Sequence, residues 1–427
     1  MGITAHTSPA RSAALLAALL TVSALAVPAA ADAPPSAATR EERRLDAAAP
    51  QEILRRGGFD GEAAEFAAAL ARTRTPGQAE RLTDTTGRRL WRRAVDRAQG
   101  RGTVRGDLPR DDDRPLYWAR VGLTRTLHEW KPSFALSAQR RSALLGSLER
   151  TSRGQDSVDF PAGRGVKRVL VTGFDPFQLD DDIRRSNPSG ASALALDGTT
   201  VDTPSGPARV EAVVFPVRWD DFARGTVERT LLPHFRPGPR RVDLFTTVSQ
   251  GRPGRFDVER TNGAWRGSGT DNEGLRRGPA PVPIPRGVPT VHPQPQWTRT
   301  TLPYAALTSA TTGPYPVHDN TSVTEIPAGS TVPVERPDGP TPGSAARAGG
   351  GGDYLSNEIA YRATLLRDAI GLSVPGGHLH TPVLRFADDN GPAQGRVTDP
   401  EFERNRQTIV AQVKSLLGVA AGTVHRP

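Results

Sequence analysis

Three segments of this chain combine residue types that could bind or cleave a small ligand. The first is a loop in which two phenylalanines stand among Gly, Asp and Pro: Gly173-Phe174-Asp175-Pro176-Phe177. Because exposed aromatic rings are unfavourable in water, Phe174 and Phe177 either pack in a core or line a ligand pocket. The second segment contains Gln250 and Glu259. A lone glutamate in a polar loop is usually solvated, and the alternative is that Glu259 orients a catalytic group.

The third segment pairs a serine with a histidine. Ser356 stands where a helix is expected to begin, and His380 stands at the end of the strand that follows. Ser356 is either a helix N-cap or a nucleophile at the positive end of the helix dipole. His380 is a candidate general base. From these residues alone both readings of Ser356 stay open.

The elements that must position these residues are strands alternating with helices. Short β-branched runs predict strands at Lys167–Val171, Arg209–Val217, Val242–Val248 and His378–Leu384. Apolar residues at three- and four-residue spacing predict helices at Ser189–Leu196, Trp219–Leu232, Asn357–Ile370 and Glu401–Leu417. This alternation predicts an α/β fold over about 166–420, a three-layer sandwich with a mostly parallel sheet. In such a sheet, sites form beyond the carboxyl ends of the strands.

The remaining chain divides into a helical region and one irregular stretch. Helical periodicity predicts a small all-α domain over 40–150, for which the sequence indicates no role. The polar segment 151–165 separates two apolar patterns, which predicts that the chain from Lys167 onward folds by itself. A Pro/Gly-rich insertion at about 311–350 is expected to be partly disordered and to end in a flexible run, Gly349–Gly352.

The first residues indicate export. Arg11 precedes an apolar run, Ala13–Val27, of about 15 residues, shorter than the roughly 20 that span a bilayer. Small residues follow, so the sequence predicts a signal peptide over 1–31, cleaved near Ala31, a linker over 32–39, and a secreted protein without a membrane span. A retained membrane anchor is the alternative.

Composition limits the chemistry. The 427 residues include no cysteine, which excludes disulfides, thiolate metal sites and a cysteine nucleophile. The net charge is +9, but arginines alternate with acidic residues and no aromatic residues lie between them, so nucleic-acid binding is not expected. His378 and His380 are a close histidine pair without a third ligand nearby, so no metal or organic cofactor is expected.

In order and spacing, several motifs of this chain resemble the pyrrolidone-carboxylate peptidase (pyroglutamyl peptidase I) family of cysteine peptidases. The resemblance covers about 167–384. The matching segments are Gly173–Phe177, Asn187–Ser189, Gln250, Glu259-Arg260, Asp271–Gly274, Thr301–Pro303, Tyr354–Asn357 and Gly377–Pro382.

The resemblance implies an α/β sandwich that removes an N-terminal pyroglutamyl residue from peptides with a Cys–His–Glu triad. It places Ser356 at the nucleophile position, with His380 as base and Glu259 as its orienter. Phe174 and Phe177 would flank the lactam ring, with Gln250 nearby. Ser356 replaces the family's cysteine, so it would need full base assistance from His380.

Two functions from different classes follow. One is a secreted pyroglutamyl peptidase-like hydrolase with a Ser356–His380–Glu259 triad, acting on peptides with N-terminal pyroglutamate. The other is a catalytically inactive member of that family that binds pyroglutamyl or other peptide ends. The sequence does not specify an oligomeric state.

Overall fold

The computed structural model of the protein describes residues 2, 38–103, 105–161, 165–393 and 395–424. The predicted signal peptide and most of the predicted linker therefore lie outside the described residues. Of the described helices, none is both long and apolar enough to cross a membrane.

The region before the first strand is helical, as the sequence predicts. Local signals set the helix starts: Thr39 and Glu42 form a capping box, Thr75 caps a helix that begins with Pro76, and Ser137 caps another. The helices are α1 (Arg40–Arg44), α2 (Ala48–Gly57), α3 (Glu62–Ala71), α4 (Pro76–Ala98), α5 (Arg114–Glu129) and α6 (Ala138–Thr151).

A seven-stranded, mostly parallel sheet forms the centre of the rest of the chain, which confirms the predicted α/β class. Its strand order is β10-β5-β14-β4-β1-β3-β2, and only the β5–β14 and β2–β3 pairs are antiparallel. The strands are β1 (Lys167–Phe174), β2 (Thr199–Val201), β3 (Ala208–Phe215), β4 (Leu244–Gln250), β5 (Phe256–Glu259), β10 (Val317–Asn320) and β14 (Gly376–Thr381). Two further antiparallel pairs of short strands are β6 (Thr261–Gly263) with β9 (Trp297–Arg299), and β7 (Trp265–Arg266) with β8 (Ala280–Pro281).

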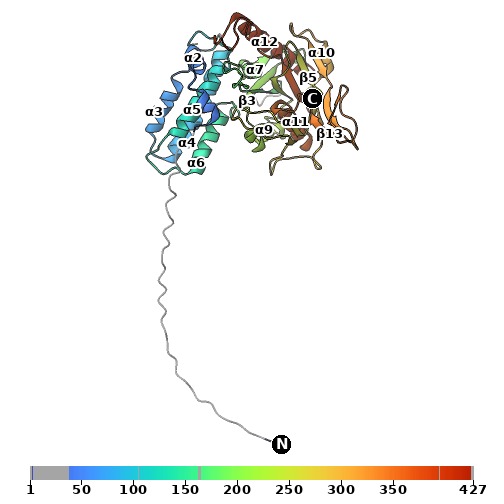
Figure 1. Ribbon diagram of the computed structural model, residues 1–427, viewed down its shortest axis with the longest axis horizontal. Coiled ribbons are helices and arrows are strands. Elements are labelled where there is room, and N and C mark those ends of the chain that lie inside the picture. Colours follow the sequence, from blue (N-terminus) through green and yellow to red (C-terminus); the bar gives the residue numbers. More distant parts are fainter. Residues whose placement is uncertain (1, 3–37, 104, 162–164, 394, 425–427) are drawn as a thin grey trace.

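Helices cover both faces of this sheet. Alternate residues of β1 show the division, because Val169 and Val171 belong to one apolar cluster and Leu170 to another. The first cluster includes α7 (Pro188–Leu196), α10 (Tyr304–Ser309) and α12 (Pro400–Gly422). The second includes α8 (Trp219–Ala223), α9 (Thr226–Phe235) and α11 (Leu355–Ala369). Figure 1 shows the N-terminal helices packed beside this α/β part.

Two local expectations need correction. The helix expected over Trp219–Leu232 is broken into α8 and α9 at Gly225. The φ of Gly225 is 81°, which is outside the helical range, so the first helix cannot continue through it. The segment expected to be a partly disordered insertion contains β10 and a three-stranded sheet of β11 (Val323–Ile326), β12 (Val334–Arg336) and β13 (Ala345–Ala348). Its strands are too short to give a sequence pattern. A buried Glu325 stabilises the small sheet by accepting hydrogen bonds from Arg336 and Thr341.

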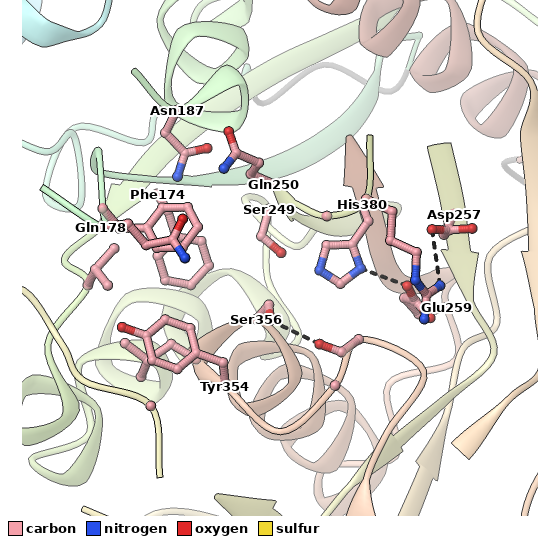
Figure 2. Close-up of a pocket in the computed structure, with 18 of the residues that line it drawn as sticks. Phe174, Gln178, Asn187, Ser249, Gln250, Asp257, Glu259, Tyr354, Ser356 and His380 are labelled. Atoms are coloured by element: carbon pink, nitrogen blue, oxygen red, sulfur yellow. Dashed lines mark hydrogen bonds and ion pairs between the residues drawn. The ribbon is translucent and has the colours of Figure 1, made fainter. Parts of the chain in front are cut away.

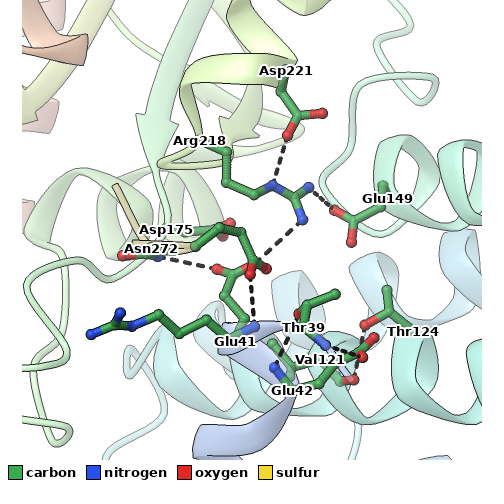
Figure 3. A network of polar contacts seen from close by, with 12 residues as sticks. Thr39, Glu41, Glu42, Val121, Thr124, Glu149, Asp175, Arg218, Asp221 and Asn272 are labelled. Atoms are coloured by element: carbon green, nitrogen blue, oxygen red, sulfur yellow. Dashed lines mark hydrogen bonds and ion pairs between the residues drawn. The ribbon is translucent and has the colours of Figure 1, made fainter. Parts of the chain in front are cut away.

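The polar join at 151–165 does not separate two cores. A single apolar cluster extends from Leu45 and Trp118 in the helical region to Val169 and Leu194 in the α/β part. Buried polar contacts cross the same boundary. Glu41 of α1 bonds Asn272 and pairs with Arg218, and Arg218 also contacts Glu149 of α6 (Figure 3). The basis for predicting that the chain from Lys167 folds alone is therefore wrong.

Candidate active site

A pocket of about 450 Å³ opens beyond the carboxyl ends of β1 and β4 (Figure 2). It is the kind of position that an open α/β sheet offers to a ligand. The structure brings all six residues singled out from the sequence to its wall: Phe174, Phe177, Gln250, Glu259, Ser356 and His380.

One wall of the pocket carries a buried histidine–carboxylate pair. Antiparallel pairing of β14 with β5 places His378 opposite Glu259, and His380 follows two residues later. The Nδ1 atom of His380 lies 2.6 Å from Oε1 of Glu259, and both residues are at most 5% exposed. In Figure 2 the other ring nitrogen of His380 points away from Glu259, toward the cavity. A carboxylate in this position fixes the orientation of the ring.

Asn320 completes the support of Glu259, and the sequence did not reveal it. Its side-chain amide donates to Oε2 of Glu259 at 2.7 Å and to the carbonyl oxygen of Gly350 at 3.0 Å. Parallel pairing of β10 with β5 places Asn320 directly beside Glu259. No local signal marks Asn320, because it lies in the segment that the sequence presents as an irregular insertion.

The glycine run expected to be flexible packs closely against this pair. A Cβ atom at Gly350 would lie 2.2 Å from Oε2 of Glu259, and one at Gly351 would lie 2.9 Å from Cε1 of His380. The run also makes two reciprocal backbone hydrogen bonds of 2.9 Å between Gly349 and Gly352. Glycine is required here so that the backbone can approach the catalytic candidates.

Ser356 is the second residue of α11, and Tyr354 is the N-cap, so the structure does not support the interpretation of Ser356 as a capping serine. Within the part of the chain that the structure describes, its hydroxyl donates to the carbonyl oxygen of Gly351 at 3.1 Å rather than to His380. The amide N–H groups of the first helical turn have no acceptor within the helix. They are therefore suited to bind an anionic oxygen close to Ser356.

The opposite wall is aromatic. Phe174 stacks on Phe222 with ring centroids 6.0 Å apart, and Phe177 stacks on Tyr354 at 6.3 Å. Tyr354 is fixed by a hydrogen bond from its hydroxyl to the carbonyl oxygen of Thr270. Gln250 lies at the end of β4, and its side-chain oxygen accepts from the Leu384 N–H at 3.4 Å. A flat uncharged ring would find apolar faces and amide partners here.

The helical region holds the loop that carries the phenylalanines. Asp175, between them, is 3% exposed and binds Arg120 of that region at 2.5 Å and Arg153, which follows α6, at 2.8 Å. Asn272 donates to the carbonyl oxygen of Pro176 at 2.9 Å and to Glu41 of α1 at 3.1 Å. The helical region therefore holds the phenylalanine loop in position, a role that the sequence did not indicate.

Asp113 of the helical region is a buried carboxyl group that contacts a pocket residue. It accepts hydrogen bonds from the Asn187 N–H at 2.9 Å and from the Ser186 hydroxyl, and Asn187 lines the pocket. Burial, with the charge of Asp112 adding to it, raises the pKa of Asp113 to about 7.

Stability is therefore expected to fall as the pH rises. A raised folded-state pKa gives stability that is fully present below the unfolded-state pKa of about 4 and is lost as the pH passes about 7. The free energy of unfolding in urea should decrease between about pH 4 and about pH 7, and less so in Asp113→Asn. Equal decreases in the two proteins would contradict this account of Asp113.

His378 and His380 both bind protein groups. His380 binds Glu259, while His378 lies between Thr247 and Ser249, with 2.7 Å to each hydroxyl oxygen. Among the described residues there is no group of three or more His, Cys, Asp or Glu residues that could hold a metal ion.

Comparisons with known proteins give one family for both parts of the chain. Residues 24–149 match the family described as PA0049 N-terminal domain, and residues 168–294 and 314–385 match PA0049, C-terminal domain. A relative from Pseudomonas aeruginosa, "Uncharacterized protein PA0049", is 35% identical over 90% of this chain and 89% of its own length.

Solved structures with partial likeness are peptidases. Pyroglutamyl peptidase I from Bacillus amyloliquefaciens is 19% identical, with a TM-score of 0.39 over 60% of this chain and 94% of that chain. Pyrrolidone carboxyl peptidase from Thermus thermophilus is 21% identical, with a TM-score of 0.36 over 58% of this chain and 98% of that chain. A structure titled Pf-PCP(1-204)-C is 22% identical, with a TM-score of 0.37 over 60% of this chain and 95% of that chain.

Proposed function

The chain belongs to the PA0049 family, and from that premise we propose that it is a pyroglutamyl peptidase-like hydrolase. It removes N-terminal pyroglutamate from peptides with Ser356 as nucleophile, His380 as general base and Glu259 as the group that orients His380. We further propose that it acts outside the cytoplasm, on the basis of the signal-like pattern of residues 1–31.

The observation that carries this proposal is the Glu259–His380 pair on the wall of a pocket with aromatic rings opposite. The contact of 2.6 Å joins two residues that are far apart in the sequence, and both are buried. A histidine that is oriented by a carboxylate and faces a cavity has the arrangement of a general base in acyl transfer. The motifs shared with pyroglutamyl peptidases support the choice of substrate.

In the proposed reaction, Ser356 Oγ attacks the carbonyl carbon of the amide bond that joins pyroglutamate to the next residue. The proton of the Ser356 hydroxyl passes to His380. N–H groups of the first turn of α11 stabilise the oxyanion that forms. His380 then gives the proton to the departing amine of the peptide, which leaves a pyroglutamyl ester on Ser356. Water, deprotonated by His380, hydrolyses the ester and releases pyroglutamate.

A serine nucleophile depends more on proton removal by His380 than a cysteine nucleophile would. A thiol has a pKa near 8.5 and ionises partly near neutral pH, whereas a serine hydroxyl does not. A helix N-terminus contributes at most about 2 kcal/mol, which does not bridge that difference. In this proposal the Ser356 hydroxyl exchanges its hydrogen bond to Gly351 for one to His380 when the substrate enters. Catalytic hydrogen bonds often form fully only in the substrate complex.

The hydrogen bond from Ser356 to Gly351 also favours a second candidate function. A serine that donates to a backbone carbonyl is not primed for attack, and the pocket can still hold a ring. In that alternative the protein binds pyroglutamyl or other peptide ends without cleaving them.

One experiment separates these functions. The purified protein is titrated with a pyroglutamyl amide of a fluorophore and with the prolyl and glutamyl amides as controls. The enzyme proposal expects binding and fluorophore release for the pyroglutamyl amide alone, because the charged amine of the two control amides would lose its hydration on entering the pocket. Binding without release supports the second candidate, and absence of both would contradict the proposed substrate.

A further inference from the structure

A second serine–histidine pair, of which the serine lines the same pocket, has no part in the reaction proposed above. Ser249, the penultimate residue of β4, lines the cavity and is 4% exposed. Its Oγ lies 2.7 Å from Nε2 of His378, which is fully buried on β14. The ring of His378 stands almost perpendicular to that of His380, with centroids 4.6 Å apart.

The hydrogen atoms of this pair can be assigned from its neighbours. The Thr247 hydroxyl donates its one hydrogen to the carbonyl oxygen of Gly377 at 3.2 Å. The arrangement of hydrogens that satisfies both Thr247 contacts then has Oγ1 accepting from Nδ1–H of His378, 2.7 Å away. In a neutral imidazole the other nitrogen, Nε2, carries no hydrogen and accepts from the Ser249 hydroxyl.

His378 is well suited to remain neutral. Burial, together with the nearby His380, holds the pKa of His378 well below its usual range. No carboxylate among the described residues contacts its ring, whereas His380 has Glu259. His378 is therefore a poor acceptor of a full proton, and Ser249 is not an activated nucleophile.

Since its hydrogen is committed to His378, the Ser249 hydroxyl offers only lone pairs to the pocket. A free serine hydroxyl either donates or accepts, so it distinguishes poorly between N–H and carbonyl groups. A hydroxyl locked in this way accepts only. It increases the affinity for a ligand that presents an N–H group. Beside a ligand without one, the hydroxyl oxygen remains an unpaired acceptor, which lowers the affinity.

We propose that Ser249, locked by His378 and Thr247, is a specificity-determining residue that accepts a hydrogen bond from the ring N–H of the substrate. This inference rests on the proposed function, and it names the ring atom that the pocket selects. It predicts preference for a lactam ring over the corresponding lactone ring, in which oxygen replaces N–H.

The test compares KM and kcat for two fluorogenic amides that differ only in this ring atom. Wild type is expected to favour the lactam by about 10- to 100-fold in KM. Ser249→Ala should raise KM for the lactam by a similar factor, lower KM for the lactone, since no acceptor is then left unpaired beside it, and alter kcat little. His378→Gln, whose side-chain oxygen can still accept from Ser249, should keep the preference. Val217→Ala, at another lining residue, should weaken both rings equally.

The outcomes separate the inference from the function on which it rests. If wild type processes both rings equally, or if Ser249→Ala keeps the lactam preference, the inference fails while the proposed function stands. Loss of kcat in Ser249→Ala with KM unchanged would also overturn it, because Ser249 would then take part in the chemistry. If wild type binds neither ring, the proposed function and this inference fail together.

Discussion

Ser356→Ala is expected to abolish release of the fluorophore while leaving binding of the pyroglutamyl ring nearly intact. The ring would still lie between Phe174 and Phe177, since neither phenylalanine depends on the serine hydroxyl. His380→Ala should cost about as much, on the order of 10⁴-fold or more in kcat, because members of a triad act as a unit. Glu259→Gln should lower kcat by a smaller factor, because the imidazole stays in place with a weaker orienting group.

Steady-state kinetics and binding titration of the same variants check this prediction. Ser415→Ala is a matched control, because this serine bonds a carbonyl oxygen on the exposed side of α12, away from the pocket. It should behave as wild type. Additive losses in the Ser356→Ala/His380→Ala double variant would contradict the idea that the two residues act together.

Arg120→Met is expected to destabilise the protein by about 2–3 kcal/mol, because the buried Asp175 loses one charged hydrogen bond while it keeps Arg153. Arg120 and Asp175 are at most 3% exposed, and their ion pair joins α5 to the phenylalanine loop. The loss should also raise KM, since the same loop carries the aromatic wall of the pocket.

The control for this prediction lies on the same helix. Arg125 pairs with Asp46 at the surface, where the two side chains are 31% and 66% exposed. Arg125→Met should cost about 0–1 kcal/mol. Adding Asp175→Asn to Arg120→Met should lower the stability further, because the buried Arg153 would then lose its contact with the Asp175 carboxylate. Urea unfolding measures all four proteins, and equal losses at Arg120 and Arg125 would contradict the account.

The dependence of the loop on the helical region also changes what is expected of a shortened chain. Separate apolar patterns in the sequence suggested that residues from Lys167 onward fold alone. In the structure, the apolar cluster shared by Trp118 and Leu194 would be exposed by such a truncation. Patterns along the chain indicate which side chains are buried, but they do not say which elements bury them.

The same distinction explains what the sequence could predict of the site. The alternation of strands and helices predicted the fold class, because apolar residues recur with a different spacing in strands and in helices. The order of the motifs predicted that Glu259 and His380 belong to one site, and the structure places them in contact. Asn320 was missed, because its role depends on pairing between two four-residue strands from distant parts of the chain. Composition suggested disorder around it, although close packing on Glu259 explains the glycines equally well.

Ser356→Cys tests the assignment of the catalytic centre most directly. If Ser356 occupies the nucleophile position beside His380, a thiol there has a base and oxyanion donors already in place, and its lower pKa removes the greatest obstacle to attack. Release of fluorophore from the pyroglutamyl amide should then rise above the wild-type rate, or appear if wild type is inactive. An inert Ser356→Cys protein beside an active wild type would contradict the assignment, and inert proteins that both bind the ring would leave only the binding function.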